Sequence, residues 1–257
     1  MLLYSLSTQL RVIHALFMRE MITHFGRHGL GFLWMFGEPI MFTLGVLALF
    51  SFTGHEYGGL SPQGFILTGY SGLVAWRNCV GRAANAIKSN QGLLYHRIVT
   101  IFDITLARLI FEFIAVSFSF LILTLIFYWI GIHPLPKNPA QVIVAWILLG
   151  WFAFNVGFIA SFLDHRSKFF EKFWHVMVYL AIPFTGAFSM VSWLPPKMRE
   201  ILLYSPMVNA MEYLREGYLG GGIHAIYSLS YIFFCNITLS FFALLLICQV
   251  KKYIGRE

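Results

Sequence analysis

The chain has 257 residues, of which 58% are hydrophobic and only 11% are charged, whereas an ordinary soluble domain is about 25% charged. A soluble fold of this size could not cover so much apolar surface, so we expect lipid to be the solvent for most of the chain. The formal net charge of +7 could suit nucleic acid. In a membrane protein the placement of the positive charges is more informative, and no nucleic-acid partner is expected.

The N-terminal residues predict a helix that lies along the membrane surface. Apolar residues recur there at helical spacing, and charged residues occupy the rest of the helical wheel. Such an amphipathic segment rests at the lipid–water boundary instead of crossing the membrane. We therefore expect residues 1–28 to form a cytoplasmic interface helix in contact with membrane lipids. The apolar positions are Leu6, Leu10, Ile13, Phe17 and Met21.

Further along the chain, six stretches are long and apolar enough to be membrane spans. A helix needs about 20 apolar residues to cross a hydrocarbon core of about 30 Å. The predicted fold class is therefore an all-α membrane protein with six transmembrane helices. The predicted spans are 30–52, 63–80, 104–131, 140–163, 173–193 and 226–249.

The connections between these spans differ sharply in positive charge. Fourteen of the 18 Lys and Arg residues lie in the N-terminal stretch, in the connections 77–108 and 164–172, and in the C-terminal tail. The connections on the other side hold four. Because cytoplasmic connections carry the excess of Lys and Arg, we expect both termini to lie in the cytoplasm.

The first predicted span contains Gly37-Glu38-Pro39, which a lipid-facing helix would avoid. A charged residue at a helix centre costs about 2.5–3.5 kcal/mol on insertion scales. Pro39 removes a helical hydrogen bond and predicts a kink. Glu38 is therefore expected to face either a neighbouring helix, in a structural role, or a translocation path.

The connection after the second span is helical in pattern over residues 81–100. Basic residues such as Arg82 and Lys88 alternate there with apolar ones such as Ile87 and Leu94. One interpretation is a solvated cytoplasmic loop. The other is a short helix that presents apolar and basic side chains to a cytoplasmic partner.

The connection 194–225 predicts two short helices. Pro195-Pro196 can open the first, and Ser205-Pro206 can end it and open the second. Three consecutive glycines, residues 220–222, then end the second helix. Neither helix is long enough to cross a bilayer, so we expect a periplasmic re-entrant pair that dips into the outer leaflet or rests on it. Backbone breaks at such depth require surrounding protein or a water-filled cavity.

Motifs for catalysis are absent from the sequence. It contains no G-x-x-x-x-G-K-[ST] and no G-x-S-x-G pattern, and His24 and His28 lack the glutamate of an H-E-x-x-H site. Cys79, Cys235 and Cys248 match no metal or disulfide spacing. We therefore expect no catalytic residue, metal or cofactor in this chain, and any energy for transport must come from another subunit.

Three stretches resemble segments of the ABC-2 type export permeases. "RHGLGFLWMFGEPI" resembles the start of their first span, "NAIKSNQGLLYHRIVTIFDI" their cytoplasmic coupling segment, and "SPMVNAMEYLREGYLG" the segment between their fifth and sixth spans. The coupling segment departs from many relatives, because Tyr95-His96-Arg97 stands where they carry a Pro. In length and layout the whole chain is similar to the capsule-polysaccharide export permeases (KpsM type) of Gram-negative bacteria. O-antigen and teichoic-acid permeases share this layout and stay as alternatives.

This resemblance implies a homodimer in the bacterial inner membrane that works with two copies of a separate P-loop ATPase. The ATP and Mg²⁺ would bind to that partner. The translocation path would lie at the dimer interface, and the substrate would be a lipid-linked acidic polysaccharide. A periplasmic adaptor and an outer-membrane exporter would receive the chain.

The resemblance also implies roles for individual residues. The candidate ATPase-coupling residues are Ile87, Lys88, Leu93, Leu94 and Tyr95. The candidate periplasmic gate consists of Pro206, Asn209, Glu212 and Arg215.

Aromatic rings can hold a sugar chain weakly, so several aromatic residues are candidates for the path, together with Glu38. The path candidates are Trp34, Glu38, Tyr70, Trp76, Tyr179 and Trp193. A basic cytoplasmic mouth could attract an anionic substrate, and its candidates are Arg27, Arg77, Arg82 and Arg97. Interface belts of Trp and Tyr and the positive-inside rule explain the same residues without any substrate.

Two hypotheses from other classes also remain. An intramembrane enzyme that acts on lipid-linked sugar would turn over its substrate without an ATPase. A structural scaffold or channel would function without ATP hydrolysis.

Overall fold

The computed structural model describes residues 2–25, 37, 39–49, 60–94, 99–220 and 222–254. Within these ranges every regular element is a helix and no strand occurs, so the predicted all-α class is confirmed. Glu38, Trp34 and Arg27 lie outside the described residues, as do Tyr95 and Arg97.

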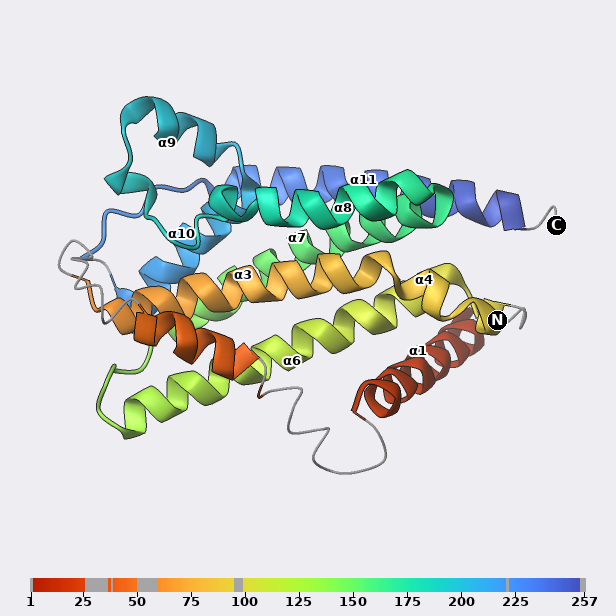
Figure 1. The fold of residues 1–257 in the computed structure, drawn as a ribbon, viewed down its shortest axis with the longest axis horizontal. Coiled ribbons are helices and arrows are strands. Elements are labelled where there is room, and N and C mark those ends of the chain that lie inside the picture. The colour runs from red at the N-terminus through yellow and green to blue at the C-terminus, as the bar shows by residue number, and fades with distance from the viewer. Residues whose placement is uncertain are drawn as a thin grey trace.

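Four long helices run beside one another along the long axis of the molecule (Figure 1). They are α3 (Pro62–Ala84), α6 (Ile101–Trp129), α7 (Pro139–Arg166) and α11 (Leu229–Ile254). Among the described residues, α6, α7 and the stretch Leu229–Cys248 are long and apolar enough to cross a membrane. A shorter apolar helix spans Pro39–Leu49.

α3 lies in the centre of the bundle and packs against α6, α7 and α10 (Pro206–Leu219). Most of its residues are buried, although it does not reach the apolar content of the other long helices. Arg77, Asn78 and Arg82 lower its mean hydropathy, and its glycines allow neighbours to approach closely. A Cβ at Gly72 would meet the side chains of Met211 and Leu149.

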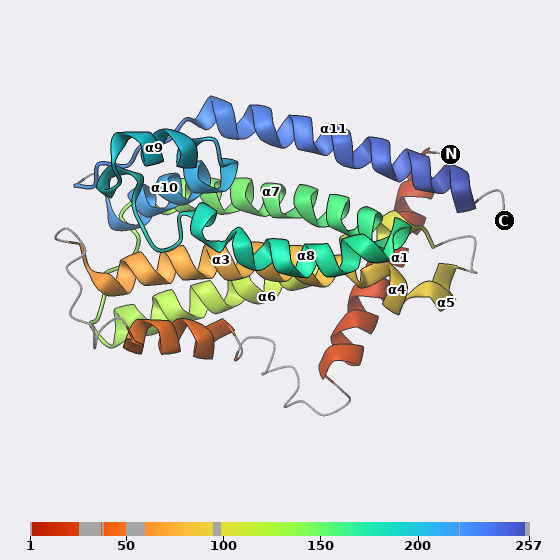
Figure 2. The ribbon, with the colours of Figure 1, turned by 45° about the horizontal axis from the view of Figure 1, so that its top comes forward.

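α1 (Leu2–Phe25) lies across the other helices, at the end of the bundle where both termini are found (Figure 2). Its inner face packs against α6, with Leu16 buried and the ring of Phe17 edge-on to that of Phe111 at 5.8 Å. Leu10 and Ile22 are exposed. A helix with one buried face and exposed apolar residues elsewhere is suited to a lipid–water boundary.

The chain between α3 and α6 does not form one continuous helix, which corrects the expected single helix over residues 81–100. α3 continues to Ala84, and two single turns follow, α4 (Ala86–Ser89) and α5 (Gln91–Leu94). Polar side chains hydrogen-bond to local carbonyls at these breaks: Oγ of Ser89 donates to Asn85 and Nδ2 of Asn90 donates to Ala86. Such local bonds compete with helix continuation.

The predicted span 173–193 is not one helix in the structure. α8 starts earlier, at Lys168, and ends at Leu180. Two 3₁₀ turns follow, η1 (Ile182–Thr185) and η2 (Val191–Trp193). Pro183 cannot continue an α-helix, and Gly186, whose φ is 71°, ends the turn η1.

Residues 194–225 contain α9 (Pro196–Leu203) and α10. α9 lies at the end of the bundle opposite the termini, and α10 lies beneath it against α7 and α3 (Figures 1 and 2). α10 ends at Gly220, whose φ of 95° favours glycine.

A polar clasp joins α7 to α11 in the middle of their length. Nδ2 of Asn155 donates to the carbonyl of Asn236 at 3.0 Å, and Oγ of Ser240 donates to Oδ1 of Asn155 at 2.9 Å. Nε1 of Trp151 donates to Oγ of Ser240 at 2.9 Å. Such bonds between helices fix their register where lipid offers no hydrophobic driving force.

Candidate functional site

The candidate gate residues on α10 form a buried polar row, which we call the outer clamp: Asn209, Glu212 and Arg215. Their spacing of three places them on one face of the helix. None is more than 1% exposed. Pro206 occupies the first position of α10, where its missing N–H removes no helical bond.

Arg215 is completely buried and holds the loop that follows η1. Its Nη1 donates to the carbonyl of Ser189 at 3.0 Å, and its Nη2 donates to that of Ala187 at 2.6 Å. The guanidinium also lies 4.0 Å from the ring centroid of Phe65 on α3. A Cβ at Gly69 would collide with the Ala187 carbonyl and with this guanidinium, so α3 requires glycine there.

Glu212 joins two further segments of backbone. Its Oε1 accepts from the N–H of Val191 at 3.1 Å, and its Oε2 accepts from that of Ile226 at 3.3 Å. Its carboxylate lies 3.8 Å from the guanidinium of Arg215. One cation and two N–H donors offset part of the cost of burying this carboxylate.

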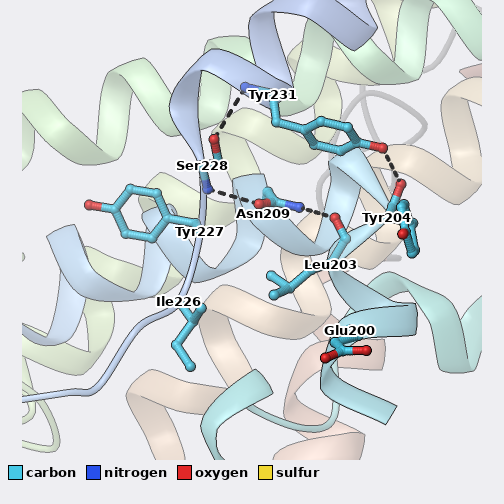
Figure 3. Close-up of a pocket in the computed structure, with 8 residues that line it drawn as sticks. All are labelled: Glu200, Leu203, Tyr204, Asn209, Ile226, Tyr227, Ser228 and Tyr231. Carbon is cyan, nitrogen blue, oxygen red and sulfur yellow. Dashed lines mark hydrogen bonds between the residues drawn. The ribbon is translucent and has the colours of Figure 1, made fainter. Parts of the chain in front are cut away.

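Asn209 closes the clamp at the other end of α10 (Figure 3). Its Nδ2 donates to the carbonyls of Leu203 and Ser205, at 2.8 and 3.0 Å, and its Oδ1 accepts from the N–H of Ser228 at 2.9 Å. The clamp thus supplies partners to backbone groups in the loop after η1, between α9 and α10, and just before α11. In a membrane, where water is scarce, irregular backbone is tolerated only when other groups of the protein supply its hydrogen-bond partners. The clamp therefore fastens α10 and its loops into one unit.

An open pocket of about 440 Å³ lies beside the clamp, between α9, α10 and the start of α11 (Figure 3). Tyr231 crosses it and donates from its hydroxyl to the carbonyl of Tyr204 at 2.8 Å. The lining residues are Glu200, Leu203, Tyr204, Asn209, Ile226, Tyr227, Ser228 and Tyr231.

Glu216, the residue directly after Arg215, links α10 to α7. Its Oε2 accepts from Nε2 of Gln141 at 2.9 Å and from the hydroxyl of Tyr227 at 2.5 Å. Burial and the neighbouring Glu216 carboxylate raise the pKa of Tyr227 to about 12. The tyrosine therefore remains a hydrogen-bond donor at physiological pH.

At the opposite end of the bundle, the candidate coupling residues do not all face outward. Ile87 is fully buried in the core, so a direct contact with a partner does not fit its position. Nζ of Lys88 lies 3.1 Å from Oδ2 of the buried Asp164, at the end of α7. Leu93 and Leu94 on α5 are half-buried, as is Lys88, so these three of the described coupling candidates remain partly accessible to a partner.

The connection is also joined to α1 and α6. Asn90 hydrogen-bonds with both Arg19 and Glu20, and Glu20 pairs with Arg108 of α6. Sequence analysis missed Glu20, Asn90 and Arg108 because their partners lie 70 to 88 positions apart along the chain.

The candidate mouth arginines that the structure describes have partners within the chain. Nη1 of Arg82 lies 3.2 Å from Oε1 of Glu112 on α6. The guanidinium of Arg77 lies 5.9 Å from the ring centroid of Phe42.

The described path candidates divide into two groups. Tyr70 and Trp76 on α3 are buried, at 7% and 6% exposed, and face the interior of the chain. Tyr179 on α8 and Trp193 on η2 are 66% and 42% exposed, and Trp193 stacks on Phe65 at 5.1 Å. A substrate or a second subunit can reach only the second group without rearrangement of the fold.

No group of three or more His, Cys, Asp or Glu side chains gathers as a metal site in the described ranges.

Comparisons with known proteins cover nearly the whole chain. A model of the family described as "ABC-2 type transporter" matches residues 11–219. The capsule polysaccharide export inner-membrane protein CtrC of Neisseria meningitidis serogroup B is 36% identical over 249 residues, which are 96% of this chain and 94% of that protein. The corresponding protein BexB of Haemophilus influenzae is 32% identical over the same shares of both chains. The polysialic acid transport protein KpsM of Escherichia coli is 29% identical over 235 residues, 91% of each chain. The chain belongs to the ABC-2 type transporter family.

Proposed function

We propose that this chain is the membrane permease subunit of an ABC transporter that exports capsular polysaccharide across the inner membrane. The similarity to capsule polysaccharide export inner-membrane proteins over 96% of the chain carries the proposal. These relatives favour a capsular glycan over O-antigen or teichoic acid as the substrate.

The topology of this subunit is six spans with both termini in the cytoplasm. Four of the spans correspond to α3, α6, α7 and α11, and the other two to the segment around Pro39–Leu49 and to α8 with the turns after it. Two observations support this: both termini lie at one end of the bundle, and most Lys and Arg lie in the segments expected there. The outer clamp and α9 then lie at the periplasmic end.

ATP hydrolysis takes place on a separate ATPase, of which two copies serve a homodimer of this chain. Transport then requires the partner to push on the segment that holds α4 and α5, which we call the α4–α5 connection. Leu93 and Leu94 remain accessible there. The ATP and Mg²⁺ belong to that partner.

The substrate is a lipid-linked acidic polysaccharide that passes between the two copies and on to a periplasmic adaptor and an outer-membrane exporter. Of the described path candidates, Tyr179 and Trp193 are the better placed to touch it, because their rings are exposed on the segment from α8 to η2. Broad rings with few rotamers can hold sugar faces weakly and let them slide.

The test is reconstitution of export. The chain, co-expressed with the ATPase of its gene neighbourhood, should restore surface polysaccharide to cells that lack their own permease. Export should stop when the partner's ATP hydrolysis is abolished. Export that continues without hydrolysis would indicate a channel, and turnover of a lipid-linked glycan by the purified chain alone would indicate an enzyme.

A further inference from the structure

One amide side chain, Asn90, joins α1 to the α4–α5 connection. Asn90 follows the last residue of α4 and is 5% exposed. Its Oδ1 accepts a hydrogen bond from Nη1 of Arg19 at 2.7 Å, and its Nδ2 donates to Oε1 of Glu20 at 3.1 Å. Two consecutive residues of α1 therefore hold the two ends of one amide.

Glu20 extends this contact to α6. Its second oxygen, Oε2, pairs with Nη1 of Arg108, and both side chains are largely buried. A buried carboxylate is stable only where cations and hydrogen-bond donors surround it. We call the four residues Arg19, Glu20, Asn90 and Arg108 the inner junction, where α1, α4 and α6 meet.

The chemistry of the inner junction requires an amide at position 90. Its carbonyl oxygen faces a cation and its NH₂ group faces an anion, and among side chains of this size only asparagine supplies both. Aspartate has the same shape, but it would place a second carboxylate oxygen against that of Glu20. The contact with Glu20 therefore depends on Nδ2 of Asn90.

We propose that Asn90 is a positioning residue that makes α1 move together with the connection on which the ATPase acts. This inference rests on the proposed function, because only a driven connection has movement to transmit. α1 lies beside α4 in both views and crosses the end of the bundle (Figures 1 and 2). Displacement of α4 thus reaches the lipid–water boundary through α1, and reaches the start of α6 through Glu20 and Arg108.

The first experiment uses the full chain alone in lipid nanodiscs and measures hydrogen exchange of the α1 amides. Asn90→Asp should raise their exchange about tenfold, because repulsion from Glu20 releases α1 from the connection. Asn85→Asp is the matched control, since among the described contacts the side chain of Asn85 makes no hydrogen bond with α1. Unchanged exchange in Asn90→Asp would overturn the proposal.

A double variant keeps the test independent of general misfolding. In Asn90→Asp/Glu20→Gln the amide and the carboxylate exchange places. The new glutamine can donate to the new carboxylate and still accept from Arg108, while Arg19 gains an opposite charge as its partner. The hydrogen bond to the carbonyl of Ala86 is lost in both variants, so recovery in the double variant reports the contact with Glu20. Exchange that stays high in the double variant would also overturn the proposal.

The second experiment measures surface polysaccharide and ATP hydrolysis in cells and membranes that contain the partner ATPase. Export should fall about tenfold in Asn90→Asp with hydrolysis retained, and the double variant should regain it. Normal export in Asn90→Asp would overturn the transmission role. If the wild-type chain neither exports nor stimulates the ATPase, the proposed function fails, and the exchange measurements still decide whether the junction exists.

Discussion

Different kinds of hydrogen-bond partner stabilise the two ends of the bundle. In the outer clamp, Asn209, Glu212 and Arg215 hydrogen-bond almost entirely to backbone groups. In the inner junction, side chains bond to side chains across α1, α4 and α6. Backbone groups cannot change partners without remaking the loop that carries them, whereas side chains can rotate to new ones. We infer that the outer end keeps its shape and that the inner end transmits movement, as proposed for Asn90.

The largest effect should come from removing the cation of the outer clamp. Arg215→Met leaves the carbonyls of Ala187 and Ser189 without donors and Glu212 without its cation, which should cost about 3–5 kcal/mol of folding stability. The measurement is the midpoint of thermal unfolding in detergent together with the yield of inserted protein. Lys197→Met, on exposed α9, is the control and should behave as wild type. A stable Arg215→Met protein would contradict the view of a rigid outer end.

Two glycine substitutions on α3 distinguish the contact of this helix with the loop held by the outer clamp from the stability of the helix itself. Gly69→Ala should destabilise the protein by about 1–3 kcal/mol, because the methyl group meets the Ala187 carbonyl. No described atom lies within 4 Å of a Cβ at Gly81, so Gly81→Ala should stabilise the helix by about 0.5–1 kcal/mol. Unfolding midpoints of the two variants should shift in opposite directions. Shifts of the same sign would show that local helix propensity, and not the clamp, determines the outcome.

A charge exchange tests whether Lys88 acts within the chain or on the ATPase. Lys88→Glu faces the buried Asp164 with a like charge, and should cost about 1–3 kcal/mol since Lys88 is itself about one-third exposed. Export should fall with it. In Lys88→Glu/Asp164→Lys the pair is restored with its sign reversed, and both stability and export should largely recover.

Lys172→Glu, an exposed change on α8, serves as the matched control for this exchange. Recovery of stability without recovery of export would assign Lys88 to the surface that contacts the ATPase.

The smallest effect should come from Tyr227→Phe, beside the outer clamp. It removes the hydrogen bond to Glu216 and should cost about 0.5–1.5 kcal/mol near neutral pH. The pKa of Tyr227 is raised to about 12 in the folded chain, so the hydroxyl's contribution should be complete below about pH 10 and should disappear as the pH rises to 12. Unfolding curves of both proteins between pH 7 and 12 provide the measurement. A difference that grows with pH would show that the opposite protonation state is the stabilising one.

Several features of the fold could be predicted because they depend on local chemistry. Long apolar runs predict α6, α7 and α11, and proline or glycine marks the starts and ends of α9 and α10. The expected helix over 173–193 failed because hydropathy continues through Pro183 and Gly186, where the backbone cannot.

The candidate sites were harder to predict because they depend on contacts between distant parts of the chain. The alternation of basic and apolar residues predicts Ile87 at the surface. The interruption of the helix at Asn85 instead places its side chain in the core. The inner junction and the Lys88–Asp164 pair join residues that no local pattern relates. The row Asn209, Glu212 and Arg215 was found in the sequence, but its bonds to backbone were not.

The central position of α3 has a consequence for how the protein is made. α3 leaves the ribosome before α6, α7 and α10, the helices that later surround it, and its own residues are the least apolar among the four long helices. On the proposed six-span topology, the translocon must either release a helix with Arg77 and Asn78 into lipid that does not favour it, or retain it until its neighbours arrive. We therefore expect membrane integration of this permease to be cooperative across several spans.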